Sequence, residues 1–200
     1  MKLSFYLFFS VLFFSFSDHV YALENEEQAF QIKPEIYVKI DDGTPVYIHK
    51  NKYFPCDHGL NHGGGCTRVH FYAEMKGSDF TPDGILKKIT LQIGLKNIEV
   101  ELSSELKRKT CLFDVILKHE LTHLALHRKI LKRFAPEIAK AVLIVAEEQK
   151  GALTQKKFDK IAQVLNDYLS KMMKEDERQN ALMDSDEAYV FQQKQCGGLK

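Results

Sequence analysis

The apolar residues of this chain change their spacing near residue 104, and no other feature constrains the fold as much. From about 35 to 103, apolar and polar residues mostly alternate, which is typical of strands with one buried face. From about 104 to 200, apolar residues recur at steps of three and four, which is typical of amphipathic helices. Strands followed by helices predict an α+β fold, with an antiparallel β-rich half and then a helical half.

Turn residues divide the first half into strands. They occur at Asp41-Asp42-Gly43, in a Gly-rich loop from Cys56 to Cys66, and at Thr81-Pro82-Asp83-Gly84. The patterned segments around them predict five strands: 35–40, 45–50, 68–75, 88–95 and 97–103.

Capping residues and helix breakers divide the second half. The first helix is expected to begin after Thr110, whose hydroxyl can cap it, and to end before Pro136, which lacks an amide hydrogen. Four helices are predicted: 111–134, 136–149, a third from Thr154 to the charged run 174–178, and a last from near Ser185 to just before Gly197.

The N-terminus predicts a targeting segment. Lys2 precedes an apolar run of about 14 residues, which is shorter than the roughly 20 that a membrane span needs, and Val20-Tyr21-Ala22 resembles a cleavage site. We expect residues 1–22 to be a signal peptide and residues 23–200 to form a single exported domain, periplasmic or extracellular, with no membrane span. The formal net charge of +1, with both signs interspersed, argues against a nucleic-acid partner.

The four cysteines all lie in the predicted exported part, where an even number favours disulfides. Of the three possible pairings we favour Cys56–Cys66, which closes a short loop, together with Cys111–Cys196, which ties the first helix to the last.

Two histidines, His58 and His62, lie inside the Cys56–Cys66 loop. Cysteines and histidines at this spacing can also bind a structural zinc ion, so a separate zinc site in the loop is an alternative to the disulfide. The glycines of the loop would let it border a substrate cleft.

The segment KHELTHLALHR, residues 118–128, carries the candidate chemistry. His119, Glu120 and His123 form an HExxH sequence inside a predicted helix. Residues i and i+4 lie one turn apart on one helix face, so the two imidazoles can chelate one Zn²⁺. Glu120 lies beside that face and can take a proton from a zinc-bound water as a general base. The alternative is a hydrogen-bonded pair of helix histidines without a metal.

This motif resembles the active-site helix of the zincin superfamily of zinc metallopeptidases. The resemblance implies that His119 and His123 are zinc ligands and that Glu120 is the catalytic glutamate. It also implies a β-sheet before this helix and further helices after it, which agrees with the predicted order of elements.

His127 repeats the four-residue step but is not expected to be the third ligand. On a straight helix it lies about 6 Å beyond His123 along the axis. In the metzincin subgroup, HExxHxxGxxH, a glycine breaks the helix and brings a later histidine back, whereas no glycine follows His123 here. His127 is instead expected near the site or packed beside it.

The third ligand is expected from a later segment, as in the gluzincin subgroup, where a glutamate on a later helix supplies it. Glu187, in the first turn of the last predicted helix, is the first candidate, and Tyr189 is a candidate for stabilising the oxyanion. Four acidic residues are alternatives as the ligand: Asp184, Asp186, Glu147 and Glu148.

These features predict an exported zinc-dependent metallopeptidase that hydrolyses peptide bonds through a zinc-bound water activated by Glu120. The expected partner is a peptide or protein substrate, and 97–103 is a candidate sheet edge to which such a chain can add. Deformylases also use HExxH, but their Glu-Gly-Cys-Leu-Ser motif is absent. An alternative of another class is a non-catalytic secreted protein that binds zinc structurally with the same helix.

Overall fold

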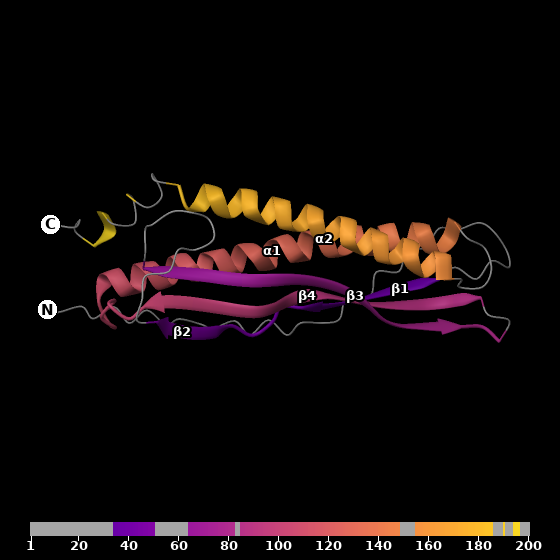
Figure 1. Cartoon of the computed structure of the whole chain (residues 1–200), viewed down its shortest axis with the longest axis horizontal. Helices are drawn as coiled ribbons and strands as arrows, with labels where there is room; N and C mark the ends of the chain where they lie inside the picture. The colour runs from indigo at the N-terminus through magenta and orange to yellow at the C-terminus, as the bar shows by residue number, and fades with distance from the viewer. Residues whose placement is uncertain are drawn as a thin grey trace, which may run out of the picture.

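The computed structural model describes residues 34–50, 64–82, 85–148, 155–185, 190 and 194–196. Figure 1 shows an elongated molecule in which the strands and two long helices run along the same axis. The elements follow in the order β1 (Glu35–Asp41), β2 (Val46–Lys50), β3 (Gly65–Phe80), β4 (Leu86–Ser103), α1 (Cys111–Glu148) and α2 (Gln155–Met183). The predicted α+β class is confirmed, while the predicted signal peptide lies outside the described residues.

β4 is the central strand of the sheet. β1 and β2 both pair with it in parallel and in the same register, since Glu35 lies opposite Lys88 and Val46 lies opposite Glu99. They therefore form one edge strand that is interrupted at 42–45. β3 pairs with β4 in antiparallel orientation along the opposite edge.

The prediction of an antiparallel sheet was wrong, because two of the three strand pairings are parallel. Among the described strands, β1 and β2 do not pair with each other, nor do β2 and β3. Instead, β4 lies between β3 and the edge formed by β1 and β2. The segment 97–103 therefore has a neighbour on each side, so its predicted role as an exposed substrate-binding edge was also wrong.

A β-bulge merges the last two predicted strands into β4. Asn97 has a φ of 52° and lies where the pairing of β3 with β4 shifts, between Arg68 and His70. The extra residue moves the buried apolar side chains of β4 from odd numbers, Ile89 to Leu95, to even numbers, Ile98 to Leu102. The buried stripe thus stays on one face of the sheet although the sequence alternation breaks.

α1 continues through Pro136, where the sequence predicted a break. The proline is exposed, whereas Ala135 and Ile138 beside it are buried. Water can therefore satisfy the carbonyl that loses its amide partner, while the opposite helix face keeps its apolar contacts. The two predicted helices form one helix of 38 residues, roughly 57 Å long.

α2 likewise continues through the charged run 174–178, where the third predicted helix was expected to end. Within this run Glu175 accepts hydrogen bonds from Arg178 one turn later and from Arg133 of α1. Such pairs stabilise an exposed helix face, so the charges do not end the helix. The predicted cap Thr154 and most of the last predicted helix lie outside the described residues.

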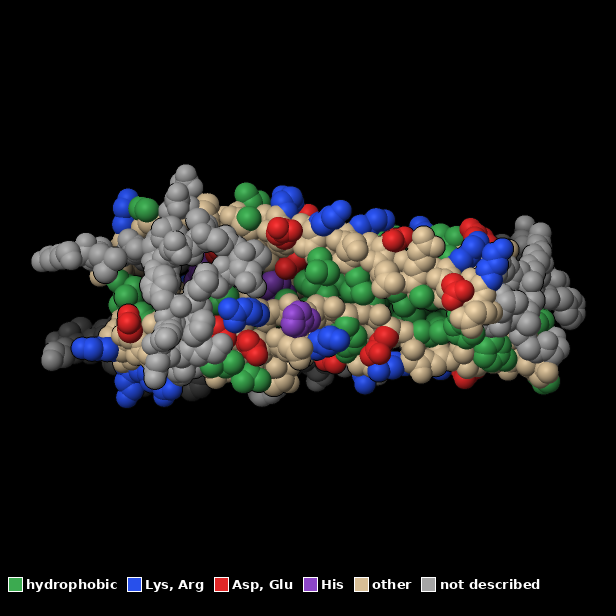
Figure 2. Space-filling model, viewed as in Figure 1, with side chains coloured by type: hydrophobic (Ala, Val, Ile, Leu, Met, Phe, Trp, Pro, Cys, Tyr) green, Lys and Arg blue, Asp and Glu red, His purple; other side chains and the backbone are tan. Residues whose placement is uncertain are grey.

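The main core lies between α1 and one face of the sheet. α2 packs against α1 and β3, and Figure 2 shows a band of hydrophobic side chains between α2 and the strands. In the described part of the chain, neither helix is apolar enough to cross a membrane. Buried members of this core include Ile89, Leu91, Ile93 and Leu95 of β4, Ile130, Leu131, Ile138 and Val142 of α1, and Ile161, Leu165 and Met172 of α2.

Two contacts fix the start of α1. Thr110 Oγ1 accepts a hydrogen bond from the amide of Phe113 (3.3 Å), so the predicted N-cap is confirmed. The predicted Cys111–Cys196 disulfide is also present. It ties the C-terminal segment to the helix that carries HExxH.

Tyr72 links three strands on the sheet face opposite α1. Its hydroxyl donates to Asp41 Oδ2 of β1 and accepts from Gln92 Nε2 of β4, each at 2.8 Å. Gly94 leaves room for this contact, because a Cβ there would lie 2.9 Å from the Tyr72 ring. Burial and the hydrogen bond to Asp41 raise the pKa of Tyr72 to about 12.

We expect Tyr72→Phe to lower the free energy of unfolding by about 1 kcal/mol at neutral pH, because two hydrogen bonds are lost. Since the folded pKa is raised, the contribution of Tyr72 is complete below pH 10 and is lost as the pH rises from 10.0 through about 12. Urea unfolding of both proteins should show their difference shrinking over this range. A difference that stays constant would contradict the assignment.

Candidate metal centre

Three ligand side chains from both helices converge near the N-terminus of α1. His119 and His123 lie one turn apart, with their Nε2 atoms 2.9 Å from each other. Asp184, directly after α2, places its Oδ1 3.0 Å from His119 Nε2 and 2.8 Å from His123 Nε2. We call these residues the His–His–Asp cluster. Within the described ranges, no other group of three or more such side chains can reach one metal ion.

Asn180 fixes the protonation of His123. The Nδ2 of Asn180 donates to the backbone carbonyl of Asp176 (2.8 Å), so its Oδ1 faces His123. An amide oxygen can only accept, and therefore the Nδ1 of His123, 2.6 Å away, is the donor. In the neutral ring the lone pair is then on Nε2 and points into the cluster, which is how proteins orient a metal-binding histidine.

The cluster fits a cation such as Zn²⁺. His123 Nε2 faces a carboxylate oxygen and a second imidazole nitrogen, an arrangement that either a proton or a metal ion between them stabilises. Two imidazoles and one carboxylate form a known catalytic zinc ligand set. Ligands 2.0–2.1 Å from a tetrahedral zinc lie roughly 3.4 Å apart. The three donor atoms, 2.8–3.0 Å apart, need to separate only slightly to reach that geometry.

The electrostatics of the cluster favour charge on both kinds of ligand. Burial raises the pKa of Asp184, but its hydrogen bonds with His119 and His123 outweigh this effect and leave the pKa lowered. Burial lowers the pKa of His123, but its hydrogen bonds with Asp184 and Asn180 outweigh this effect and leave the pKa raised. The contacts of His123 with Asp184 thus favour a positive charge between the two side chains, which a proton or a metal ion supplies, and the proton competes with the metal because only the neutral imidazole is a ligand.

Glu120 is buried beside the cluster and against β3. Its Oε2 accepts a hydrogen bond from Thr67 Oγ1 (2.9 Å), and a Cβ at Gly65 would lie 2.7 Å from its Cγ. Burial raises the pKa of Glu120, while His123 and Thr67 partly offset the rise. A carboxylate with a raised pKa accepts a proton more readily at neutral pH.

The polar contacts between α1 and α2 repeat with the helical period. α1 carries three polar residues at steps of four, and α2 together with Asp184 directly after it supplies three more. The two sets run in opposite directions because the helices are antiparallel. We call the three resulting pairs the polar ladder: His119–Asp184 (3.0 Å), His123–Asn180 (2.6 Å) and His127–Asp176 (2.6 Å).

The first candidate for the third ligand, Glu187, lies outside the described residues, as do Tyr189 and Asp186. Their roles stay predictions. Asp184, one of the alternatives, is the residue that contacts both histidines.

Three other sequence candidates are placed away from the ligand atoms. Glu147 and Glu148 lie near the far end of α1, roughly 36 Å from His123 along the axis, which is too far to share a metal. His127 is not part of the His–His–Asp cluster, since its Nδ1 contacts Asp176 instead.

Residues 56–63 of the Gly-rich loop, with Cys56, His58 and His62, lie outside the described residues. Cys66, at its end, is buried and disulfide-bonded. A disulfide sulfur is not a thiolate, so Cys66 is not available as a ligand for the alternative zinc site in this loop.

Sequence reasoning missed Asp176, Asn180 and Thr67. The first two, with Asp184, form a DxxxNxxxD pattern with the same four-residue spacing as the three histidines. This shared spacing could have indicated that the two sets of side chains contact each other. Thr67 had no local signal, because it lies 53 residues from Glu120 and reaches it only through the fold.

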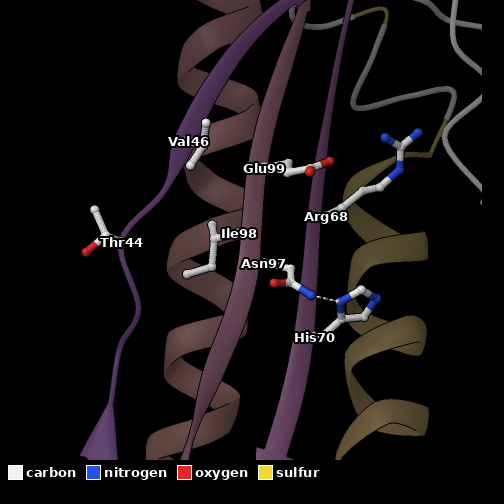
Figure 3. Close-up of a pocket in the computed structure, with 7 residues that line it drawn as sticks. All are labelled: Thr44, Val46, Arg68, His70, Asn97, Ile98 and Glu99. Atoms are coloured by element: carbon white, nitrogen blue, oxygen red, sulfur yellow. Dashed lines mark hydrogen bonds between the residues drawn. The ribbon is translucent and has the colours of Figure 1, made fainter.

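A second hollow lies on the sheet face opposite the helices, as Figure 3 shows. Three of its polar side chains are already paired, since His70 contacts Asn97 (3.2 Å) and Arg68 contacts Glu101 (2.8 Å). The sheet separates it from the His–His–Asp cluster. It has a volume of about 450 Å³ and is lined by Thr44, Val46, Arg68, His70, Asn97, Ile98 and Glu99.

In comparisons with known proteins, no family model, no curated protein and no solved structure matches this chain. Its function is therefore inferred from the geometry of the described residues.

We expect Asn180→Ala to weaken zinc binding by about 10- to 100-fold, because His123 loses the partner that orients its ring. Competition with a chromogenic chelator measures this affinity. The matched control is Asn166→Ala, an exposed asparagine on the same helix, which should leave it unchanged. Equal affinities in wild type and Asn180→Ala would show that Asn180 does not support the site.

Proposed function

We propose that this chain is a zinc-dependent metallopeptidase with His119, His123 and Asp184 as metal ligands and Glu120 as the general base. The observation that carries the proposal is the convergence of three ligand atoms within 3.0 Å of one another, beside a buried carboxylate. The predicted role of Glu187 as third ligand is replaced in this proposal by Asp184.

Each residue of the site has its own role in the proposed reaction. When bound, zinc supplies Lewis acidity, which polarises a carbonyl group and makes a water molecule more acidic. Glu120 accepts a proton from the attacking water on its carboxylate and delivers it to the leaving amine. Thr67 holds that carboxylate against β3, and Asn180 keeps the His123 lone pair directed at the ligand position.

An extended peptide is the substrate that the fold favours. β3 is the strand that lies alongside the candidate site, and it pairs with β4. Thr67 of this strand contacts Glu120. An extended chain that runs along β3 past Thr67 would therefore pass the general base. In this proposal β3 takes the place of 97–103 as the substrate-binding strand.

A catalytic role is better supported than a purely structural zinc site. Two imidazoles and one carboxylate are a ligand set of catalytic zinc sites, and the buried Glu120 beside them is a group that a purely structural site does not need. The side chains of His119 and Asp184 also stay 16% and 22% exposed, which leaves access for water. Export remains part of the proposal, and the Cys111–Cys196 disulfide is compatible with an oxidising compartment.

We expect Glu120→Gln to retain zinc and to lower peptide hydrolysis by about 10²- to 10⁴-fold, because the amide cannot accept the proton. Gln is nearly isosteric and can still accept the hydrogen bond from Thr67. Hydrolysis of a quenched peptide library and zinc content should both be measured, with Glu137→Gln on the exposed face of α1 as the control.

Two results would count against a peptidase. Undiminished hydrolysis by Glu120→Gln would show that Glu120 is not the general base. A wild-type protein that binds one zinc ion but cleaves no peptide, with or without a chelator, would favour the non-catalytic zinc-binding alternative.

A further inference from the structure

We propose that the His127–Asp176 pair positions the metal centre: it sets how α2 is seated on α1, and thereby the affinity for the metal, although neither residue touches the ligand atoms. This inference rests on the proposed metal site and adds a residue pair that controls it.

The apolar packing of α2 ends well before the ligand that follows the helix. Met172 is the last buried apolar residue of α2, and Asp184 lies twelve positions later. Between them, Asn180 is the one buried side chain of the helix. The last three turns of α2 are therefore held to α1 mainly by polar contacts, and the polar ladder supplies those nearest the cluster.

The His127–Asp176 pair is the first contact of this ladder after the apolar packing ends. Its Nδ1–Oδ1 distance is 2.6 Å, and its side chains are 7% and 14% exposed. The edge of the His127 ring also packs near Phe71 of β3, with the ring centroids 6.0 Å apart. Water cannot easily replace a buried hydrogen bond of this kind, so its loss should shift the helix that carries the other contacts.

Asp176 is also linked to the cluster by a direct chain of contacts. Its backbone carbonyl accepts the hydrogen bond from Asn180 Nδ2, and Asn180 Oδ1 in turn accepts from His123 Nδ1. A displacement of α2 at Asp176 would therefore affect His123 through Asn180. It would also displace Asp184, which follows Asp176 by about two helical turns.

A neighbouring ion pair provides a matched control. Arg133 of α1 contacts Glu175 of α2 at 3.2 Å, so it joins the same two helices at the adjacent position. Its arginine side chain is 48% exposed, and exposed ion pairs contribute little. If any contact between the helices were enough to position α2, removing either pair would lower the metal affinity by the same amount.

The test compares the full-length wild type with Asp176→Ala, Asp176→Asn, His127→Ala, the double variant of His127→Ala with Asp176→Ala, and Glu175→Ala. Zinc affinity is measured by chelator competition, and the geometry of the site by the visible absorption of bound Co²⁺. Folding is checked by circular dichroism, and Asp176→Asn, which retains a hydrogen-bond acceptor, covers the case in which Asp176→Ala does not fold.

We expect Asp176→Ala to weaken zinc binding by about 10- to 100-fold and to alter the Co²⁺ spectrum. Asp176→Asn should recover part of the affinity, and the double variant should bind no more weakly than the worse single variant, because the pair acts as a unit. Glu175→Ala should stay within about twofold of wild type.

Wild-type affinity in a folded Asp176→Ala or Asp176→Asn and in His127→Ala would overturn the inference and leave the proposed function standing. An equal loss in Glu175→Ala would overturn it as well. A wild-type protein that binds no zinc would instead overturn the proposed metal centre itself.

Discussion

The packing of α1 against the buried stripe of β4 is the constraint on which every candidate functional group depends. The stripe fixes which face of α1 is buried, and HExxH lies on that helix, so Glu120 comes to face Thr67 on β3. α1 in turn presents its histidines to α2 along the polar ladder. The position of Asp184 depends on this second contact, because Met172 is the last fully buried apolar residue of α2.

The class of the fold could be predicted from the sequence, because it depends on local periodicity. The change from a period of two to a helical period identified the strands, the start of α1 and its cap at Thr110. The strand order could not be predicted in this way. It depends on β4 entering between β3 and the β1–β2 edge, which is a long-range pairing without a local signal. Tertiary burial also overrode two local signals, at Pro136 and at the bulge of Asn97.

The candidate site, like the fold, could be predicted from the sequence only where the relation between residues is local. His119, Glu120 and His123 could be singled out because four-residue spacing on one helix determines their relation. The partner residues on α2 lie 49 to 65 positions away in the sequence, so their contacts follow only from the antiparallel seating of the helices. The antiparallel packing of the two helices also explains why His127 continues the four-residue spacing. It contacts Asp176 of α2 and is not a metal ligand.

The central claim is that α1 and α2 together bind one metal ion between His119, His123 and Asp184. Anomalous diffraction at the zinc absorption edge, from crystals of the zinc-loaded protein, tests it most directly. We predict a single strong peak within zinc–ligand distance, roughly 2.0–2.2 Å, of both histidine Nε2 atoms and the Asp184 carboxylate. A peak bound by the two histidines with another residue in place of Asp184, or a peak elsewhere in the molecule, would contradict it.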